Sequence, residues 1–258
     1  MGILDGKHAV VTGAGTGIGR AIAIRFASEG AAVALLGRRR AKLDETLAAM
    51  TGHSDERRHL AVPTDISEPE QVEAAAQRIR EVWGTVDILV NNAAIGGSAD
   101  PIDSSWDDWV QPIRVNMLGA MHCCRAFVLL MPNGGRVVNV TSIHRDRVEK
   151  GASAYASAKG ALTQYTKALA LELADRNILV NAIAPGFVDT PMSVQEDGVS
   201  ELETDWFRAN YVDGHHLPLR RPGGPEEIAG VALFLVGPDA TYVCGETITV
   251  DGGLTITF

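Results

Sequence analysis

The feature that most constrains the fold of this chain is a regular alternation between short apolar segments and segments of helical period. Seven segments are rich in Val, Ile and Leu, as is typical of parallel strands buried on both faces. They are His8–Thr12, Ala32–Leu36, His59–Val62, Val86–Val90, Arg136–Val140, Ile178–Ile183 and Thr247–Val250. This alternation predicts an α/β fold of a single domain over residues 1–258, a doubly wound parallel seven-stranded sheet with helices on both faces.

Composition narrows the classes of function that remain open. The chain has 258 residues and a formal net charge of -9, which argues against nucleic acid as a partner. Its three cysteines form no disulfide or zinc pattern, so we expect a reducing, cytoplasmic location and no metal site. Met1 leads almost directly into the first strand, and no run of apolar residues is long enough to span a membrane. We therefore expect no signal peptide and no membrane partner.

One long irregular segment, at about 191–218, interrupts the alternation. It carries acidic residues between Glu196 and Asp205, followed by Trp206, Phe207 and Tyr211. Irregular segments of this length in compact domains are usually functional lids or disordered, and the aromatic residues favour a lid here. We expect a substrate lid that contains a short helix and is mobile without ligand.

A glycine-rich turn follows the first predicted strand and opens the first predicted helix. The sequence TGAGTGIG spans Thr12–Gly19, and Gly13, Gly17 and Gly19 let the backbone turn tightly and approach a pyrophosphate. Backbone N–H groups at the start of a helix attract phosphate. The turn therefore predicts a dinucleotide-binding site.

The Gly-x3-Gly-x-Gly spacing of this turn resembles the short-chain dehydrogenase/reductase family, and other motifs follow in the order of that family. NNAA at Asn91–Ala94 resembles its Asn-Asn-Ala-Gly, with Ala94 in place of glycine. Asp65, NAIAPGFVDT at Asn181–Thr190 and VDGG at Val250–Gly253 match further family positions. The resemblance implies an NAD(P)-dependent oxidoreductase that transfers a hydride between nicotinamide and a secondary alcohol or carbonyl. It also implies a homotetramer, which the apolar C-terminal tail supports.

Tyr155 and Lys159 lie four residues apart, on one face of a predicted helix. A phenol has a pKa near 10, and a nearby ammonium lowers it, which suits a general acid/base that acts on a hydroxyl or carbonyl. The resemblance assigns Ser142, which follows the fifth strand, to hold the substrate oxygen. It assigns Asn116 to support a proton-relay water. The predicted catalytic residues are Asn116, Ser142, Tyr155 and Lys159.

The end of the second strand predicts which nicotinamide cofactor is used. Enzymes that use NAD place an acidic residue there for the ribose hydroxyl, but Gly37 occupies this position and Arg38 follows. A guanidinium suits a phosphate, so we expect NADP to be preferred, with NAD possible and Arg39 or Arg40 solvated. Thr16 weakens the preference, because many NADP-dependent relatives carry Lys or Arg there. The predicted cofactor-binding residues are Gly13, Gly15, Thr16, Gly17, Ile18, Gly19, Arg38, Asp65, Ile66, Asn92, Ala93, Tyr155, Lys159, Pro185, Gly186, Val188 and Thr190.

The substrate end is less constrained by the sequence. His144 follows Ser142 closely and resembles the Ser-x-His-Glu of glucose-type dehydrogenases, although Arg145 replaces the glutamate. The charged loop after Ser142 is also compatible with plain solvent exposure. The predicted substrate residues are His144, Ile95, Phe187 and Met192, with Gly97 and Trp206 as further apolar walls. We expect a small-molecule substrate, a polar alcohol or sugar-like polyol. The alternatives are a 3-oxoacyl-thioester reductase that acts on an acyl-carrier protein and a non-catalytic dinucleotide sensor.

Overall fold

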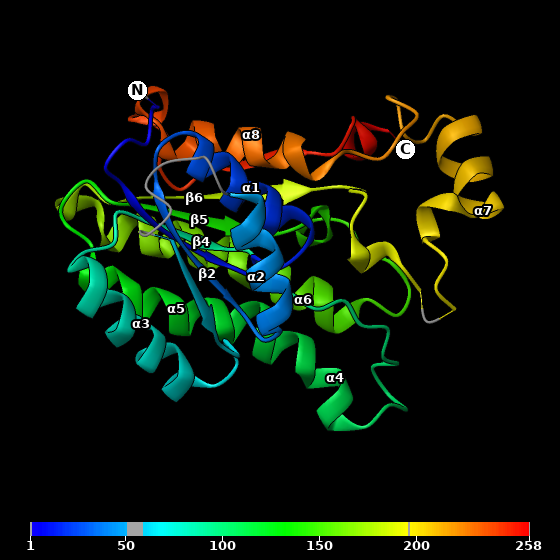
Figure 1. Ribbon diagram of the computed structural model, residues 1–258. Coiled ribbons are helices and arrows are strands. Elements are labelled where there is room, and N and C mark those ends of the chain that lie inside the picture. Colours follow the sequence, from blue (N-terminus) through cyan, green and yellow to red (C-terminus); the bar gives the residue numbers. More distant parts are fainter. Residues whose placement is uncertain (1, 51–58, 196, 258) are drawn as a thin grey trace.

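The sheet of this protein is parallel and seven-stranded, with the strand order β3-β2-β1-β4-β5-β6-β7. The computed structural model describes residues 2–50, 59–195 and 197–257 (Figure 1). The strands are β1 (His8–Thr12), β2 (Ala32–Gly37), β3 (Leu60–Pro63), β4 (Ile88–Asn91), β5 (Arg136–Val140), β6 (Leu179–Pro185) and β7 (Thr247–Val250). The predicted fold class is confirmed.

Helices cover both faces of the sheet because side chains of successive strand residues point to opposite faces. In β1, Ala9 and Val11 join one buried cluster while Val10 joins the other. The first cluster includes residues of α1 (Gly17–Ser28), α2 (Arg40–Ala49) and α8 (Pro225–Val236). The second includes residues of α3 (Pro69–Trp83), α5 (Ala120–Phe127) and α6 (Ser153–Glu172). Figure 1 shows α1 and α8 on one side of the strands and α3, α5 and α6 on the other.

The boundaries of four strands, β2, β3, β4 and β6, differ from the sequence prediction by one or two residues. The fourth strand begins at Ile88 rather than Val86, and the carboxylate of the preceding Asp87 accepts a hydrogen bond from the backbone N–H of His8 at 2.9 Å. The third begins after His59, whose Nδ1 atom accepts the Val33 backbone N–H at 3.1 Å. The sixth runs to Pro185, where it still pairs with β7.

A continuous helical segment, Trp106–Leu130, combines α4 (Trp106–Ile113), a π-helical stretch (Arg114–Gly119), α5 and a 3₁₀ turn (Val128–Leu130). By length and composition alone this segment is apolar enough to cross a membrane, which the sequence analysis did not anticipate. The buried side chains of Val115, Cys123 and Phe127 belong to the second core cluster. A core helix passes the same test, and we interpret this segment as one.

The irregular segment after β6 contains short helical pieces. They are Pro191–Ser193, Glu201–Glu203 and α7 (Asp205–Phe207), which continues as a π-helical stretch (Arg208–Asp213). Phe207 is buried and contacts Phe187 edge-on, with ring centroids 4.9 Å apart. Figure 1 shows α7 beyond the end of the sheet. The predicted acidic residue Glu196 lies outside the described residues, and the mobility of the segment stays a prediction.

Candidate active site

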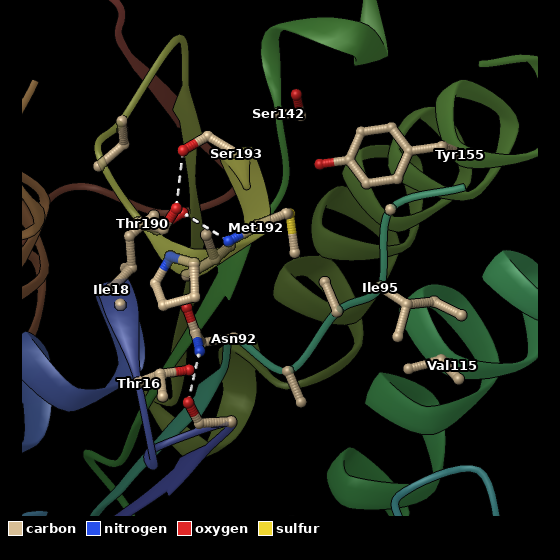
Figure 2. A pocket seen from close by; sticks show the side chains of 18 of the residues that line it. Thr16, Ile18, Asn92, Ile95, Val115, Ser142, Tyr155, Thr190, Met192 and Ser193 are labelled. Carbon is tan, nitrogen blue, oxygen red and sulfur yellow. Dashed lines mark hydrogen bonds between the residues drawn. The ribbon is translucent and has the colours of Figure 1, made fainter. Parts of the chain in front are cut away.

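A cleft of about 820 Å³ lies at the carboxyl ends of the strands. The turns that leave β1, β4, β5 and β6 line it with Gly13, Asn92, Thr141 and Gly186. The sheet order reverses between β1 and β4, and ligands of open α/β sheets bind outside the carboxyl ends at such a point. Figure 2 shows Thr16, Ile18 and Asn92 in one part of the cleft and Ser142 and Tyr155 in another.

The glycine-rich turn is braced by β4. The Thr12 Oγ1 atom accepts hydrogen bonds from the backbone N–H groups of Asn92 at 2.9 Å and Ala93 at 3.0 Å. The Asn92 amide donates to the Thr12 carbonyl at 2.9 Å. A Cβ atom on Gly19 would lie 2.4 Å from that amide and from the Gly13 carbonyl, so this position requires glycine. The turn thus keeps its backbone exposed to the cleft, as a dinucleotide pyrophosphate requires.

The predicted cofactor residues line the cleft, with one exception. Gly19 is not among the lining residues, because it packs against Gly13 and Asn92 behind the turn. The Asn92 side chain reaches the cleft, but its amide group braces the turn. Residues that the sequence analysis did not name, among them Lys42, Leu43, Thr64 and Ser193, also line the cleft.

The three consecutive arginines differ in their surroundings. Arg40 pairs with Asp44 at 2.8 Å and does not line the cleft. Arg38 and Arg39 both line it, and neither has an ion-pair partner among the described residues. The expectation that Arg39 is simply solvated is therefore incomplete, because its exposed side chain also borders the cleft. Two guanidinium groups remain open to an anion at this end.

Ser142 and Tyr155 come together in the middle of the cleft. Ser142 follows β5, and its Oγ atom accepts the His144 backbone N–H at 3.2 Å. Tyr155 projects from α6, and Figure 2 shows its hydroxyl directed toward Ser142. Burial raises the pKa of Tyr155, and its hydrogen bond with Ser142 opposes that rise. This pair of hydroxyls can bind a single oxygen atom of a ligand from two sides.

Lys159 lies behind Tyr155 and is 2% exposed. Its Nζ atom donates to the Val140 carbonyl at 2.8 Å and lies 5.6 Å from the centre of the Tyr155 ring. Burial lowers the pKa of Lys159 to about 7. The sequence predicts that Lys159 lowers the pKa of Tyr155, but the pKa of Tyr155 is raised, since desolvation outweighs its hydrogen bond with Ser142.

Asn116 lies outside the lining of the cleft, in the π-helical stretch. Its amide accepts the Ile95 backbone N–H at 2.8 Å and donates to the Ile95 carbonyl at 2.9 Å. The oxygen and the nitrogen of this amide are both hydrogen-bonded to the backbone of Ile95. Asn116 therefore fixes the loop after β4, a contact that differs from the expected support of a relay water.

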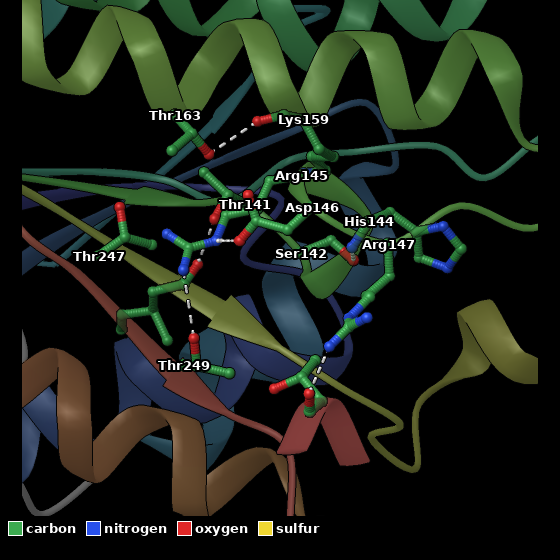
Figure 3. A network of polar contacts seen from close by, with 12 residues as sticks. Thr141, Ser142, His144, Arg145, Asp146, Arg147, Lys159, Thr163, Thr247 and Thr249 are labelled. Carbon is green, nitrogen blue, oxygen red and sulfur yellow. Dashed lines mark hydrogen bonds and ion pairs between the residues drawn. The ribbon is translucent and has the colours of Figure 1, made fainter. Parts of the chain in front are cut away.

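The loop after Ser142 is tied to the C-terminal part of the chain (Figure 3). Arg145 pairs with Asp146 at 2.8 Å and donates to the Thr249 hydroxyl at 3.4 Å. Arg147 donates to the Thr255 carbonyl at 2.6 Å. The charged loop is thus anchored rather than freely solvated, and the anchors position His144 at the cleft.

The predicted substrate residues His144, Ile95, Phe187 and Met192 all line the cleft, as does Gly97. Trp206 does not, because its 62% exposed side chain packs against Tyr211 with ring centroids 5.6 Å apart. The His144 ring meets Tyr155 edge-on at 5.6 Å. Burial lowers the pKa of His144, and its Nδ1 atom has no hydrogen-bond partner among the described residues.

Glu149 and Glu201 also line the cleft, and the sequence analysis did not assign them to the site. The acidity of the irregular segment was a signal for Glu201. No sequence signal distinguished Glu149 from the neighbouring charges of its loop.

Comparisons with known proteins agree with this geometry. The family model described as Enoyl-(Acyl carrier protein) reductase matches residues 13–255. An uncharacterized oxidoreductase of Bacillus subtilis (strain 168) is 39% identical over 98% of this chain and 93% of its own length. A galactitol 2-dehydrogenase (L-tagatose-forming) of Cereibacter sphaeroides is 39% identical over 98% of this chain and 96% of its own length.

A solved structure shares both the fold and the full length. A short-chain dehydrogenase from Burkholderia cenocepacia J2315, determined in complex with NADP, superposes with a TM-score of 0.88. It is 33% identical and covers 98% of this chain and 99% of its own. The likeness therefore extends over the cleft and the glycine-rich turn.

Proposed function

Because this chain belongs to the short-chain dehydrogenase/reductase family, we propose that it is an NADP-preferring dehydrogenase of small polar secondary alcohols, with Tyr155 as general acid/base. Membership establishes the coarse activity, oxidoreduction of an alcohol or carbonyl with a nicotinamide cofactor. The proposal adds the cofactor preference, the substrate class and the roles of the residues.

One observation carries the proposal. The Ser142 and Tyr155 hydroxyls converge in a cleft that continues to the glycine-rich turn, with Lys159 buried behind them. A substrate oxygen held between these hydroxyls would lie beside a partly buried phenol whose proton can move to or from it. The same convergence disfavours a non-catalytic dinucleotide sensor, which has no use for a proton donor at this position.

The nicotinamide cofactor fits the remainder of the cleft, since the glycine-rich turn offers bare backbone to a pyrophosphate, and Gly186 and Thr190, from the segment after β6, also line the cleft. When bound, the cofactor supplies the acceptor or donor of the hydride. In oxidation, Tyr155 as phenolate takes the proton of the substrate hydroxyl, and in reduction it returns that proton to the carbonyl oxygen. Ser142 orients the oxygen, and Lys159 modulates the charge state of Tyr155.

The preference for NADP rests on the end of β2. Gly37 offers no carboxylate to a ribose hydroxyl, while Arg38 and Arg39 face the cleft without ion-pair partners among the described residues. A guanidinium forms paired, charge-assisted hydrogen bonds with phosphate. NAD remains usable, because Thr16 adds no positive charge to the turn.

The polyol substrate class rests on the polar lining around His144 and on relatives whose names give galactitol and glucose as substrates. The second candidate is a 3-oxoacyl-thioester reductase, which the names of other relatives give. That activity needs a basic surface at the cleft mouth for an acidic carrier protein. In the loop after Ser142, Arg145 pairs with Asp146 and Arg147 donates to the Thr255 carbonyl, while Lys150 is exposed and lines the cleft beside Glu149, which dilutes its charge.

We extend the proposal to the whole protein: a single-domain cytoplasmic enzyme that forms a homotetramer, with 191–218 as a lid. The lid proposal is supported by Met192 and Glu201, which come from this segment and line the cleft. Large exposed apolar side chains, such as those of Leu129 and Leu171, would be removed from water in an oligomer.

The test is an absorbance assay of cofactor reduction over polyols, sugars, simple secondary alcohols and 3-hydroxyacyl thioesters, with NADP and NAD in parallel. The proposal expects turnover of a polyol or sugar, with a higher kcat/KM for NADP than for NAD. Efficient turnover of thioesters alone would replace it with the second candidate.

A further inference from the structure

Two carboxylates from different segments lie at the substrate end of the cleft. Glu149 belongs to the loop after β5, and Glu201 begins the 3₁₀ turn Glu201–Glu203 of the irregular segment. Both line the cleft together with His144 and Ser142. Neither carboxylate has a role in the proton transfer described above.

The loop and the irregular segment hold these residues in place. Glu149 lies beside His144, with 4.0 Å between its Oε2 atom and the imidazole Nε2 atom. The residue before Glu201, Ser200, is tied back to the cleft wall by a 3.1 Å hydrogen bond with the Ser193 hydroxyl and by bridge pairing with Val194. The backbone that carries Glu201 is thus fixed to the same wall that carries Met192.

The two carboxylates interact electrostatically. Desolvation raises the pKa of Glu201, and the negative charge of Glu149 raises it further. The pKa of Tyr211 is also raised, first by desolvation and then by the negative charges of Glu149 and Glu201. Lys150 also lines this end and, like the two carboxylates, is exposed, but it contributes to neither shift.

We propose that Glu149 and Glu201 are specificity-determining residues that select neutral, multiply hydroxylated substrates and reject substrates with an anionic group. The inference rests on the proposed function, because it takes the space beside Tyr155 as the place of the substrate. Carboxylates accept hydrogen bonds from hydroxyl groups remote from the reacting carbon, and these charge-assisted bonds are stronger than neutral ones. A substrate carboxylate would instead meet two like charges.

A pair of ligands with the same carbon skeleton tests the proposal: galactitol, which is neutral, and galactonate, which is an anion. Dissociation constants for both are measured by calorimetry on the protein saturated with NADPH, with which an alcohol cannot react, and turnover with NADP is measured separately. The variants are Glu149→Gln, Glu201→Gln and the double variant, which remove charge and keep size. Glu203→Gln is the matched control, because it removes the same charge from the same 3₁₀ turn without lining the cleft.

We expect galactitol to bind the wild-type protein at least about tenfold more tightly than galactonate, because the anion meets the repulsion of two like charges, both at exposed positions. Each single substitution should reduce this ratio about threefold, and the double variant should abolish it. Salt should also reduce the ratio of the wild-type protein, through screening. Glu203→Gln should leave the ratio unchanged.

Equal binding of galactitol and galactonate by the wild-type protein would overturn the proposal. So would failure of galactitol to bind, or an unchanged ratio of the two dissociation constants in a folded double variant. Circular dichroism confirms that each variant is folded. The proposed function fails differently, because selective binding without turnover of any alcohol would contradict the enzyme and leave the charge selection intact.

Discussion

Tyr155 and Lys159 lie on the same helix, and burial shifts the pKa of each toward its neutral form. The pKa of Tyr155 rises, while that of Lys159 falls to about 7. Neither shift comes from an ion pair, since Lys159 donates to a backbone carbonyl. Burial therefore sets the protonation states that the proposed chemistry uses.

The two directions of the reaction should respond differently to pH. Oxidation needs the Tyr155 phenolate, and a raised pKa keeps the phenol protonated at neutral pH, so kcat/KM for oxidation should increase as the pH rises above neutral. Reduction needs the phenol, so its kcat/KM should stay level there and fall only at higher pH. Rate profiles in both directions check this. An oxidation rate that decreases with rising pH through this range would contradict the assignment.

Arg38 and Arg40 provide a matched test of cofactor preference. Arg38→Ala should raise KM for NADP at least about tenfold, the worth of a charge-assisted contact, and leave KM for NAD nearly unchanged. Arg40→Ala should change neither, since Arg40 pairs with Asp44 away from the cleft. Steady-state kinetics with both cofactors measure the effect. The same loss from both substitutions would indicate a general effect of charge rather than a phosphate contact.

Among the elements, the turn between β1 and α1 depends on β4 for its shape. Thr12 and Asn92 exchange hydrogen bonds across these neighbouring strands, and Gly19 leaves the space that the Asn92 amide fills. The cofactor end of the cleft is therefore built from the turn after β1 together with the loop after β4, and the glycine sequence alone does not determine its shape.

Two glycine-to-alanine substitutions should have opposite effects. Gly19→Ala should destabilise the fold by about 1–3 kcal/mol, because the added methyl displaces a hydrogen-bonded amide, and it should weaken cofactor binding. Gly230→Ala, within α8 and with open space around the added methyl, should stabilise by about 1 kcal/mol. Denaturant unfolding measures both. A neutral Gly19→Ala with normal cofactor affinity would show that the turn tolerates another arrangement.

The sequence alone was sufficient to place residues whose type and spacing have a direct structural explanation. Tyr155 and Lys159 at helical spacing, and the glycines between strand and helix, could be placed in this way. The position of Glu201 could not, because it depends on hydrogen bonds within an irregular segment. The pKa of Lys159 likewise depends on how deeply α6 packs, which its sequence does not specify.

At the scale of the whole molecule, several large apolar side chains are exposed on the surface and lie outside the cleft. Leu129, Leu171 and Ile256 are each at least 81% exposed, and Tyr242 is fully exposed. Removal of such side chains from water by contact with another chain is favourable. A second copy of the chain is the partner that the proposed homotetramer requires.

Sedimentation equilibrium at micromolar concentration should give the mass of four chains. Ile256→Asp, which places a charge on the exposed C-terminal tail, should shift the distribution toward smaller species and leave the fold intact. Circular dichroism provides the control for folding. A wild-type monomer at this concentration would contradict the assembly.

The central claim is that the Tyr155 hydroxyl transfers the proton that accompanies hydride transfer. Its most direct test is the kcat of cofactor reduction, with the best alcohol from the substrate assay, in the wild-type protein, Tyr155→Phe and the control Tyr242→Phe. Removing one oxygen from Tyr155 should lower kcat by at least about a hundredfold, with folding and cofactor affinity nearly unchanged. Tyr242→Phe, which alters a fully exposed side chain, should retain wild-type kcat. A Tyr155→Phe variant that turns over at a near-normal rate would contradict the account.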